Sequence, residues 1–205
     1  MNKCDLGKVS IITMGQSPPS ETYNNACIGL PFFQGKTDFS LIHPSVRVYC
    51  AKPQKTAQSN DILISVRAPV GTTNIANQEC CIGRGLAAIT TLPDVAFYKY
   101  IFYYLRYCEK EIEKIGVGST FKAINKKDLE CLQIYLPQLY IQQKIATILD
   151  CVSNLIEKRK AQIEKLDLLV KSQFIEMFGD PVTNPMGWKT VTLNDAYPVV
   201  SKGKP

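Results

Sequence analysis

The sequence predicts an α/β (α+β) globular domain followed by a long coiled-coil-forming α-helix. Short apolar, β-branched runs separated by Gly, Pro and Asn occupy residues 6–136, which is typical of strands joined by turns. From residue 141 to 177 the chain has no Pro or Gly, and its apolar residues repeat in heptads. With 205 residues, 45% of them hydrophobic, the chain can bury one substantial core and an accessory element.

Four strands are expected in the globular part. They cover residues 9–14, 61–66 (DILISV), 85–91 (GLAAITT) and 132–136, and each is a short apolar run next to turn-forming residues. The stretch GQSPPSETYN at residues 15–24 holds two prolines and several turn formers. We therefore expect a loop directly after the first strand.

One helix is expected between the last two of these strands, within residues 94–115 (DVAFYKYIFYYLRYCEKEIEKI). Its apolar residues recur at helical spacing: Phe97, Ile101, Tyr104, Leu105, Cys108 and Ile112. Because such an apolar stripe has to be covered, we expect this helix to pack on the sheet.

The long helix carries two interleaved series of residues spaced by seven. We call these positions the seam: Ile145, Leu149, Val152, Ile156, Arg159, Ile163, Leu166, Val170, Gln173 and Met177. Heptads sustained in this way indicate a helix that pairs with another helix. Polar seam residues commonly set register and partner choice; the alternative for Arg159 is a guanidinium that extends to the helix edge. Gly179, Asp180 and Pro181 are expected to end the helix.

The last residues, GWKTVTLNDAYPVVSKGKP at 187–205, look like the start of another strand. When VTLNDAYPVVSKGKP is aligned with CDLGKVSIITMGQSP near the beginning, Leu193 falls opposite Leu6, and Val199 and Val200 fall opposite an aliphatic pair. We expect this segment to restart the fold that begins at residue 1. The predicted organisation is a globular domain at 1–137, a helix at 138–179, and a linker with the truncated start of a second domain at 180–205.

The cysteines and the ends of the chain argue against several protein classes. Eight cysteines are scattered with no CxxC spacing, and His43 is the one histidine, so we expect free thiols and no metal site. There is no run of about 18 apolar residues, and the N-terminus MNKCDLGK lacks the apolar stretch of a signal peptide. These features favour the cytoplasm.

The candidate catalytic residues show no arrangement of known spacing. GRG at 83–85 and GVG at 116–118 lack the residues that follow the glycines of a phosphate-binding loop, so we expect turns. A Ser or Cys nucleophile would depend on His43, which we expect to be a surface histidine next to Pro44. Three carboxylates lie near strand ends, at Asp61, Glu79 and Asp94. Their spacing resembles no nuclease or glycosidase site.

Polar and basic residues instead gather in the expected loops. The candidates for DNA contact are Gln16, Ser17, Gln34, Lys36, Arg67, Arg84, Ser119, Thr120, Lys122, Lys126 and Lys127. Such side chains contact phosphates and base edges, and Arg and Gln can make two-point contacts to G and A. The net charge of +6 also suits a polyanion. The alternative is a solvated surface, and for Arg67, beside Ala68 and Pro69, a structural turn residue.

Taken together, these segments resemble the DNA-specificity subunit of type I restriction-modification systems. The matching stretches are GQSPPSETYN, GLPFFQGKTDF, NDILISVRAPVGTTNIA, CIGRGLAAI, GVGSTFKAINKKDLECLQIYLPQLYIQQKIATILD and KSQFIEMFGDP. They span almost the whole chain in the family's order. One departure is Gln142 in LYIQQKI, where the family usually has Glu before the Gln, and we expect a softer interaction at a helix N-terminus there.

The resemblance implies a noncatalytic subunit of half length, with one target recognition domain at 1–137 that reads half of a split DNA site. Its helix would pair antiparallel with another as a spacer. The chemistry would belong to partners: a methyltransferase subunit that methylates adenine with S-adenosylmethionine, and a restriction endonuclease that uses ATP and Mg. This chain would need no cofactor. We hypothesise a homodimer, paired through the seam, that reads a split palindromic site. The alternatives are a non-recognising interaction module, an inactive recombination cassette, or a stand-alone nuclease with an undetected site.

Overall fold

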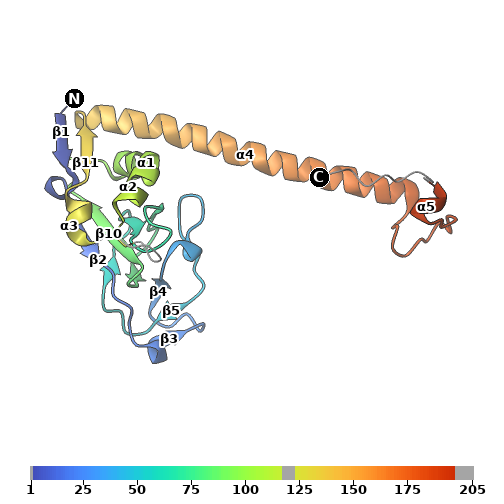
Figure 1. The fold of residues 1–205 in the computed structure, drawn as a ribbon, viewed down its shortest axis with the longest axis horizontal. Coiled ribbons are helices and arrows are strands. Elements are labelled where there is room, and N and C mark those ends of the chain that lie inside the picture. The colour runs from blue at the N-terminus through green and yellow to red at the C-terminus, as the bar shows by residue number, and fades with distance from the viewer. Residues whose placement is uncertain (1, 117–122, 197–205) are drawn as a thin grey trace. The chain divides into compact units, whose positions relative to one another are not determined.

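The computed structural model describes residues 2–116 and 123–196 of the chain (Figure 1). It divides into two compact units, Met1–Cys151 and Val152–Pro205. The sheets described below all belong to the first unit. Within the described residues, no helix has both the length and the apolar character needed to cross a membrane.

The centre of the first unit is a four-stranded antiparallel sheet in the order β2-β10-β7-β8. Its strands are β2 (Ser10–Met14), β7 (Ile62–Ser65), β8 (Thr73–Ile75) and β10 (Leu86–Thr91). Three of the expected strands are therefore confirmed as β2, β7 and β10.

This central sheet is covered on both faces, which explains its continuous apolar runs. Ile62 and Ile64 of β7 belong to one core cluster, whereas Leu63 between them belongs to another. Successive residues of a strand point to opposite faces of the sheet. A run such as DILISV is thus typical of a strand buried on both sides.

The second cluster is closed by a five-stranded sheet in the order β3-β5-β4-β9-β6. The strands are β3 (Tyr23–Asn24), β4 (Leu30–Phe33), β5 (Tyr49–Cys50), β6 (Thr56–Ala57) and β9 (Cys80–Ile82). Strands β4 and β9 run parallel, and the other neighbours run antiparallel. Sequence reasoning missed this sheet, because runs of two to four residues are too short to show a period.

The helix expected at 94–115 is two helices, α1 (Tyr98–Tyr107) and α2 (Glu109–Ile115). They meet at Cys108, whose ψ of 7° departs from the helical value. The start also lies later than expected, because the N–H of Ala96 closes a separate turn on the carbonyl of Leu92 at 2.8 Å. The expected packing is confirmed: Ile101 and Phe102 are buried in the first core cluster.

The fourth expected strand is confirmed as β11 (Gln133–Leu136), paired antiparallel with β1 (Asn2–Asp5). A 3₁₀ turn, Leu6–Lys8, leads from β1 to β2. Before β11 lies α3 (Lys126–Glu130), whose start is capped reciprocally by Asn125 and Asp128. The two hydrogen bonds measure 3.0 and 2.8 Å, the arrangement of a capping box.

The long helix is α4 (Leu139–Phe178), so the sequence prediction of one continuous helix is confirmed. Gln142 in its first turns is fully buried. Its Oε1 accepts from the Phe97 N–H at 2.9 Å, and its Nε2 donates to the carbonyls of Val95 and Pro137 at 3.0 and 2.8 Å. This amide acts through three directed hydrogen bonds, and the softer interaction at the helix N-terminus stays a prediction.

A carboxylate on the same stretch of α4 provides a second attachment. Asp150 accepts from the Tyr103 hydroxyl at 2.7 Å and pairs with the Lys99 ammonium, both from α1. These contacts fix the first part of α4 on α1 inside the first unit.

Of the segment 187–205 that was expected to start another strand, the structure describes residues 187–196, and these form no strand. Gly179, with a φ of 76°, ends α4 as predicted, and α5 (Leu193–Ala196) is a short helix. Its start is capped because the Asp195 carboxylate accepts from the Thr192 hydroxyl at 2.6 Å, and the Asp195 N–H donates back to it at 3.2 Å. Leu193 begins this turn as Leu6 begins the 3₁₀ turn after β1. Val199 and Val200 lie outside the described residues, and the repeat stays a prediction.

Candidate nucleic-acid interface

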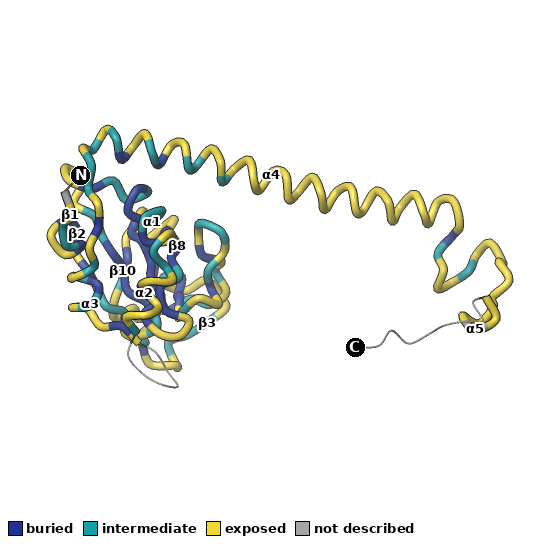
Figure 2. Tube along the Cα trace, turned by 45° about the horizontal axis from the view of Figure 1, so that its top comes forward, coloured by how far each residue is buried: buried dark blue, intermediate teal, exposed yellow. Residues whose placement is uncertain are grey.

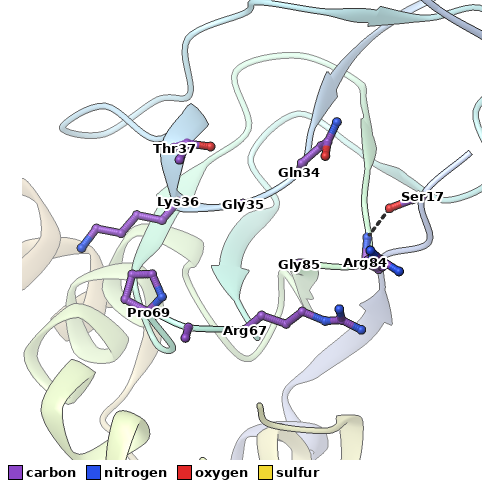
Figure 3. Close-up of a pocket in the computed structure, with 10 residues that line it drawn as sticks. Ser17, Gln34, Gly35, Lys36, Thr37, Arg67, Pro69, Arg84 and Gly85 are labelled. Carbon is purple, nitrogen blue, oxygen red and sulfur yellow. Dashed lines mark hydrogen bonds between the residues drawn. The ribbon is translucent and has the colours of Figure 1, made fainter. Parts of the chain in front are cut away.

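A hollow with a volume of about 270 Å³ opens in the first unit (Figure 3). Residues from separate loops line it: Ser17, Gln34, Gly35, Lys36, Thr37, Arg67, Ala68, Pro69, Arg84 and Gly85. Arg67 and Arg84 extend toward one side of the hollow, and Lys36 extends toward the other. The charged residues of this lining are all cations, so the hollow suits an anionic or hydrogen-bonding ligand.

The hollow brings together five residues that the sequence picked out as DNA contacts: Ser17, Gln34, Lys36, Arg67 and Arg84. Gln16 is exposed next to Ser17 in the chain. Lys126 and Lys127 are exposed on α3, where Lys126 lies 3.6 Å from the Glu130 carboxylate. Ser119, Thr120 and Lys122 lie outside the described residues. That any of these residues contacts DNA stays a prediction.

Glycines let the loops of the hollow approach one another closely. A Cβ on Gly85 would lie 2.2 Å from the carbonyl oxygen of Gln34, and one on Gly15 would lie 2.2 Å from that of Gly83. No other residue fits at those distances. The glycines of GRG thus serve backbone packing. The N–H of Arg84 between them donates to the Ser17 hydroxyl at 3.2 Å, drawn as a dashed line in Figure 3.

The loop that contains Arg67 contacts two other segments of the chain. Arg67 forms a bridge with Ala123, and the Ile124 N–H donates to the Val66 carbonyl at 3.0 Å. Five residues after Arg67, the Thr72 hydroxyl donates to the Glu109 carboxylate at 2.7 Å. Arg67 is itself exposed. The Arg67 backbone is thus tied to the segment at Ala123 and Ile124, and its side chain stays available to a ligand. A turn role for Arg67 stays a prediction.

Sequence reasoning missed Thr37, which lines the hollow, and Asp38 and Arg47, which lie behind it. Asp38 is buried and accepts hydrogen bonds from backbone N–H groups of the Gln34 turn and from Arg47. A signal was present in QGKTD, because an acidic residue three positions after a turn-forming glycine is typical of a capping arrangement.

Three of the four candidate catalytic groups, Asp61, Glu79 and His43, have structural partners. The Asp61 carboxylate accepts from the Gln58 N–H at 2.8 Å, as expected of a residue that ends a turn before a strand. Glu79 accepts from the Gln58 side chain at 3.0 Å. His43 is exposed, as predicted, with Nδ1 2.9 Å from the carbonyl oxygen of Ile75. Asp94 is exposed.

The eight cysteines are free thiols. Burial raises the pKa of Cys80 to about 12 and that of Cys81 to about 11, which keeps both thiols protonated at neutral pH. In the part of the chain that the structure describes, no three His, Cys, Asp or Glu side chains are grouped so that they could hold a metal ion.

The seam of α4 changes surroundings along its length. Ile145 packs against the first core cluster, and Leu149 is half-buried. From residue 152 onward the seam side chains are exposed, from 46% at Val152 to 69% at Val170 (Figure 2). Further apolar residues outside the seam are exposed as well: Ile148, Leu155, Leu168, Leu169, Phe174, Ile175 and Phe178. The apolar surface is thus wider than the seam that the heptads indicated.

Both polar seam residues bond along their own helix in this single chain. Arg159 donates to Gln162 at 2.8 Å, and Gln173 donates to Glu176 at 2.8 Å. This geometry agrees with a guanidinium at the helix edge. Setting the register of a helix pair stays a prediction for both residues.

Comparison with known proteins identifies the family. A family model described as the type I restriction modification DNA specificity domain matches residues 2–165. The chain belongs to this family. It is 51% identical over 157 residues to a putative type I restriction enzyme MjaX specificity subunit of Methanocaldococcus jannaschii, a match that covers 75% of this chain and 37% of that protein.

Solved structures of proteins from type I restriction-modification systems share the fold. A chain from a study titled as the structural basis of complex assembly and conformational transition of the type I R-M system is 47% identical, with a TM-score of 0.75 over 84% of this chain and 43% of that one. The HsdS subunit from Thermoanaerobacter tengcongensis is 48% identical, with a TM-score of 0.69 over 78% of this chain and 39% of that one. The S subunit from M. genitalium, 20% identical with a TM-score of 0.65, shares the fold. This chain thus spans less than half the length of these relatives.

Proposed function

We propose that this chain recognises a specific duplex DNA sequence as the specificity component of a type I restriction-modification complex. The observation that carries the proposal is the hollow, where Gln34, Lys36, Arg67 and Arg84 come together from separate loops. Arg and Gln can read base edges through two-point contacts, and Lys can neutralise phosphates. Relatives named as specificity subunits support this role.

The chemistry is assigned to partners rather than to this chain. A methyltransferase subunit with S-adenosylmethionine methylates adenine at the site that this chain selects, and a restriction endonuclease subunit with ATP and Mg cleaves DNA. The chain works in the cytoplasm, where its DNA substrate lies.

We further propose that α4 pairs antiparallel with the α4 of a second copy. The support is the exposed seam from Val152 to Met177, since a solvent-exposed apolar stripe on one helix is marginally stable in water. A two-fold pair would place two recognition units at a fixed separation and would read an inverted repeat with an unread spacer.

The decisive experiment is co-expression of the chain with its cognate methyltransferase subunit in a host free of adenine methylation. Methylated adenines are then mapped across the genome. A single split, palindromic motif is expected. A chain carrying both Gln34→Ala and Arg84→Ala serves as the matched control, which should still co-purify with the methyltransferase but lose the motif.

Other outcomes separate the competing functions. Co-purification of the wild-type chain without any methylation would favour an interaction module or an inactive cassette. Cleavage of DNA by the purified chain with a divalent metal alone would favour the nuclease.

A further inference from the structure

The turn that carries Gln34 and Lys36 is built around one buried carboxylate. The Asp38 side chain is 8% exposed. Its Oδ2 accepts from the backbone N–H of Gln34 at 2.7 Å and from that of Gly35 at 3.3 Å. The N–H of Asp38 in turn donates to the Gly35 carbonyl at 3.1 Å. The carboxylate thereby closes the turn from inside.

The other oxygen of this carboxylate is held by an arginine. Asp38 Oδ1 accepts from Arg47 Nε at 3.1 Å and also from Arg47 Nη2. The two nitrogens belong to one planar guanidinium, so the contact restrains the orientation of the carboxylate. Arg47 comes from a segment of the chain nine residues further on, and it ties that segment to the turn.

The opposite side of the turn is held by backbone packing. Gly85 lies so close to the Gln34 carbonyl oxygen that a Cβ would approach it to 2.2 Å. The Gln34 N–H is therefore held by Asp38, and the Gln34 carbonyl lies close against Gly85. Its side chain and that of Lys36 leave the turn in different directions (Figure 3).

The turn is also the wall between two hollows. Gln34 and Thr37 line the cationic hollow and a second one of about 290 Å³, whose other lining residues are Phe32, Asp38, Arg47 and Val48. A shift of this turn would change both hollows at once. A wall in this position needs a rigid support if the side chains on it are to discriminate between bases.

We propose that Asp38, oriented by Arg47, is the positioning residue for base reading by Gln34. The inference rests on the proposed function, because it assumes that the cationic hollow reads DNA. A two-point contact between Gln and a base edge fails when the amide is displaced, whereas contacts to phosphate tolerate small shifts. Loss of the Asp38 carboxylate should thus reduce discrimination between sequences before it reduces general affinity.

The test uses the full chain, alone and with the methyltransferase subunit, and a pool of duplexes with a random central segment. Dissociation constants are measured for a duplex selected from the pool and for a scrambled duplex at the same salt concentration. Asp38→Asn should lower the ratio of the two affinities by about tenfold or more, within the range expected for one lost base contact. The matched control is Asp94→Asn, which makes the same charge change at an exposed carboxylate and should leave the ratio unchanged.

A second readout follows the turn itself. Hydrogen exchange at the Gln34 and Gly35 amides, measured by NMR without DNA, should become faster in Asp38→Asn and stay unchanged in Asp94→Asn. Unchanged exchange would overturn the positioning role whether or not the chain binds DNA. A wild-type chain that does not prefer the selected duplex would instead overturn the proposed function and leave the exchange result intact.

The remaining outcome concerns a purely structural role. If Asp38→Asn lowers both affinities in parallel, together with the melting temperature, Asp38 supports the fold and the proposal is wrong. Should this variant fail to fold, Arg47→Lys takes its place, because it keeps the charge and loses the two-nitrogen contact. It should lower the affinity ratio in the same direction, and an unchanged ratio would overturn the proposal.

Discussion

The two parts of α4 share one heptad pattern but differ in burial. In the first part, up to Cys151, Gln142 and Ala146 are fully buried and Ile145 packs against the core of the globular unit. In the second part, from Val152 to Phe178, the apolar side chains are exposed. The heptads run through both parts alike. A heptad seam therefore predicts that a helix packs against another element. It does not predict whether that element belongs to the same chain or to a second one.

The polar side chains of the two parts differ in their hydrogen-bond partners. Gln142 bonds to backbone groups of the globular unit, and Asp150 bonds to two side chains of α1. Arg159 and Gln173 bond to residues three positions along their own helix. Contacts to other elements anchor a helix, whereas bonds within it stabilise it only slightly. In the second part, the apolar side chains of the seam stay exposed, and their cover by a second copy is the pairing proposed above.

The largest effect is expected in the second part of α4. Replacing both Ile156 and Ile163 with Asp should abolish self-association, because each buried Ile contributes about 1.5–3 kcal/mol and both copies lose two. The measurement is the mass of the full chain by sedimentation equilibrium.

Ala161→Asp is the matched control for this prediction. Ala161 is exposed on the face of α4 opposite the seam, so the same new charge there should leave the mass unchanged. A wild-type chain that is monomeric at all concentrations tested would contradict the pairing. If the double variant keeps the mass of the wild-type dimer, the interface lies outside the seam.

The next largest effect is expected in the first part of α4. Gln142→Glu should lower the free energy of unfolding by about 3 kcal/mol, because a carboxylate cannot donate to the carbonyls of Val95 and Pro137, and a buried polar group without a partner costs about 1–3 kcal/mol. Urea denaturation followed by circular dichroism measures this change.

Gln143→Glu provides the control, since it makes the same substitution one residue along, at an exposed position. It should change stability by less than about 0.5 kcal/mol, as is usual for surface substitutions. Equal stability of the two variants would show that the three hydrogen bonds of Gln142 do not anchor α4.

The elements that the sequence predicted share a physical property. Strands β7 and β10 are apolar on both faces, and α4 is long enough for its heptads to be unmistakable. The five-stranded sheet was missed because a strand such as β5 contributes two residues, whose pairing is decided by distant parts of the chain. The break at Cys108 was missed for a related reason, since the apolar spacing continues through it.

Only part of the candidate site could be predicted from the sequence. Loop position and residue type were enough to select Gln34, Arg67 and Arg84, which the fold brings to one hollow. The supports were not recognised, because their role depends on close packing between segments. The need for glycine at position 85 becomes clear only from its close approach to the Gln34 carbonyl. The role of Arg47 becomes clear only from its hydrogen bond to Asp38.

A smaller effect is expected from single changes at the hollow. Arg84→Ala should reduce discrimination by about 1–3 kcal/mol and change the methylated motif if this residue reads a base. Lys127→Ala should weaken binding to all sequences alike and reduce the salt dependence by about one phosphate contact. Affinities for selected and scrambled duplexes over a range of salt concentrations measure both effects.

Lys158→Ala on α4 is the control for these changes, because it removes a lysine from the second unit and should not alter discrimination. If Arg84, Arg67 and Lys127 can each be replaced by Ala without a change in affinity or motif, the recognition surface lies elsewhere.

The smallest expected effect concerns the reactivity of thiols, which differs between the exposed surface of α4 and the buried strand β9. Cys151 is exposed on α4, whereas Cys80 and Cys81 are buried in β9. Because burial raises the pKa of Cys80 to about 12 and that of Cys81 to about 11, these thiols lose their protons only at high pH, and the reactive thiolate is scarce at pH 8. Iodoacetamide should label Cys151 rapidly and both buried thiols only on unfolding, as measured by mass spectrometry of peptides.

The position of Cys151 makes this labelling independent of helix pairing. It follows the seam residue Leu149 by two positions and therefore points away from the seam. Cys151 should react at the same rate in the wild-type chain and in the Ile156→Asp, Ile163→Asp variant, while Cys80 stays protected in both. Protection of Cys151 in the wild-type chain alone would mean that the partner covers a face wider than the seam, as the exposed Ile148 and Leu155 beside it allow.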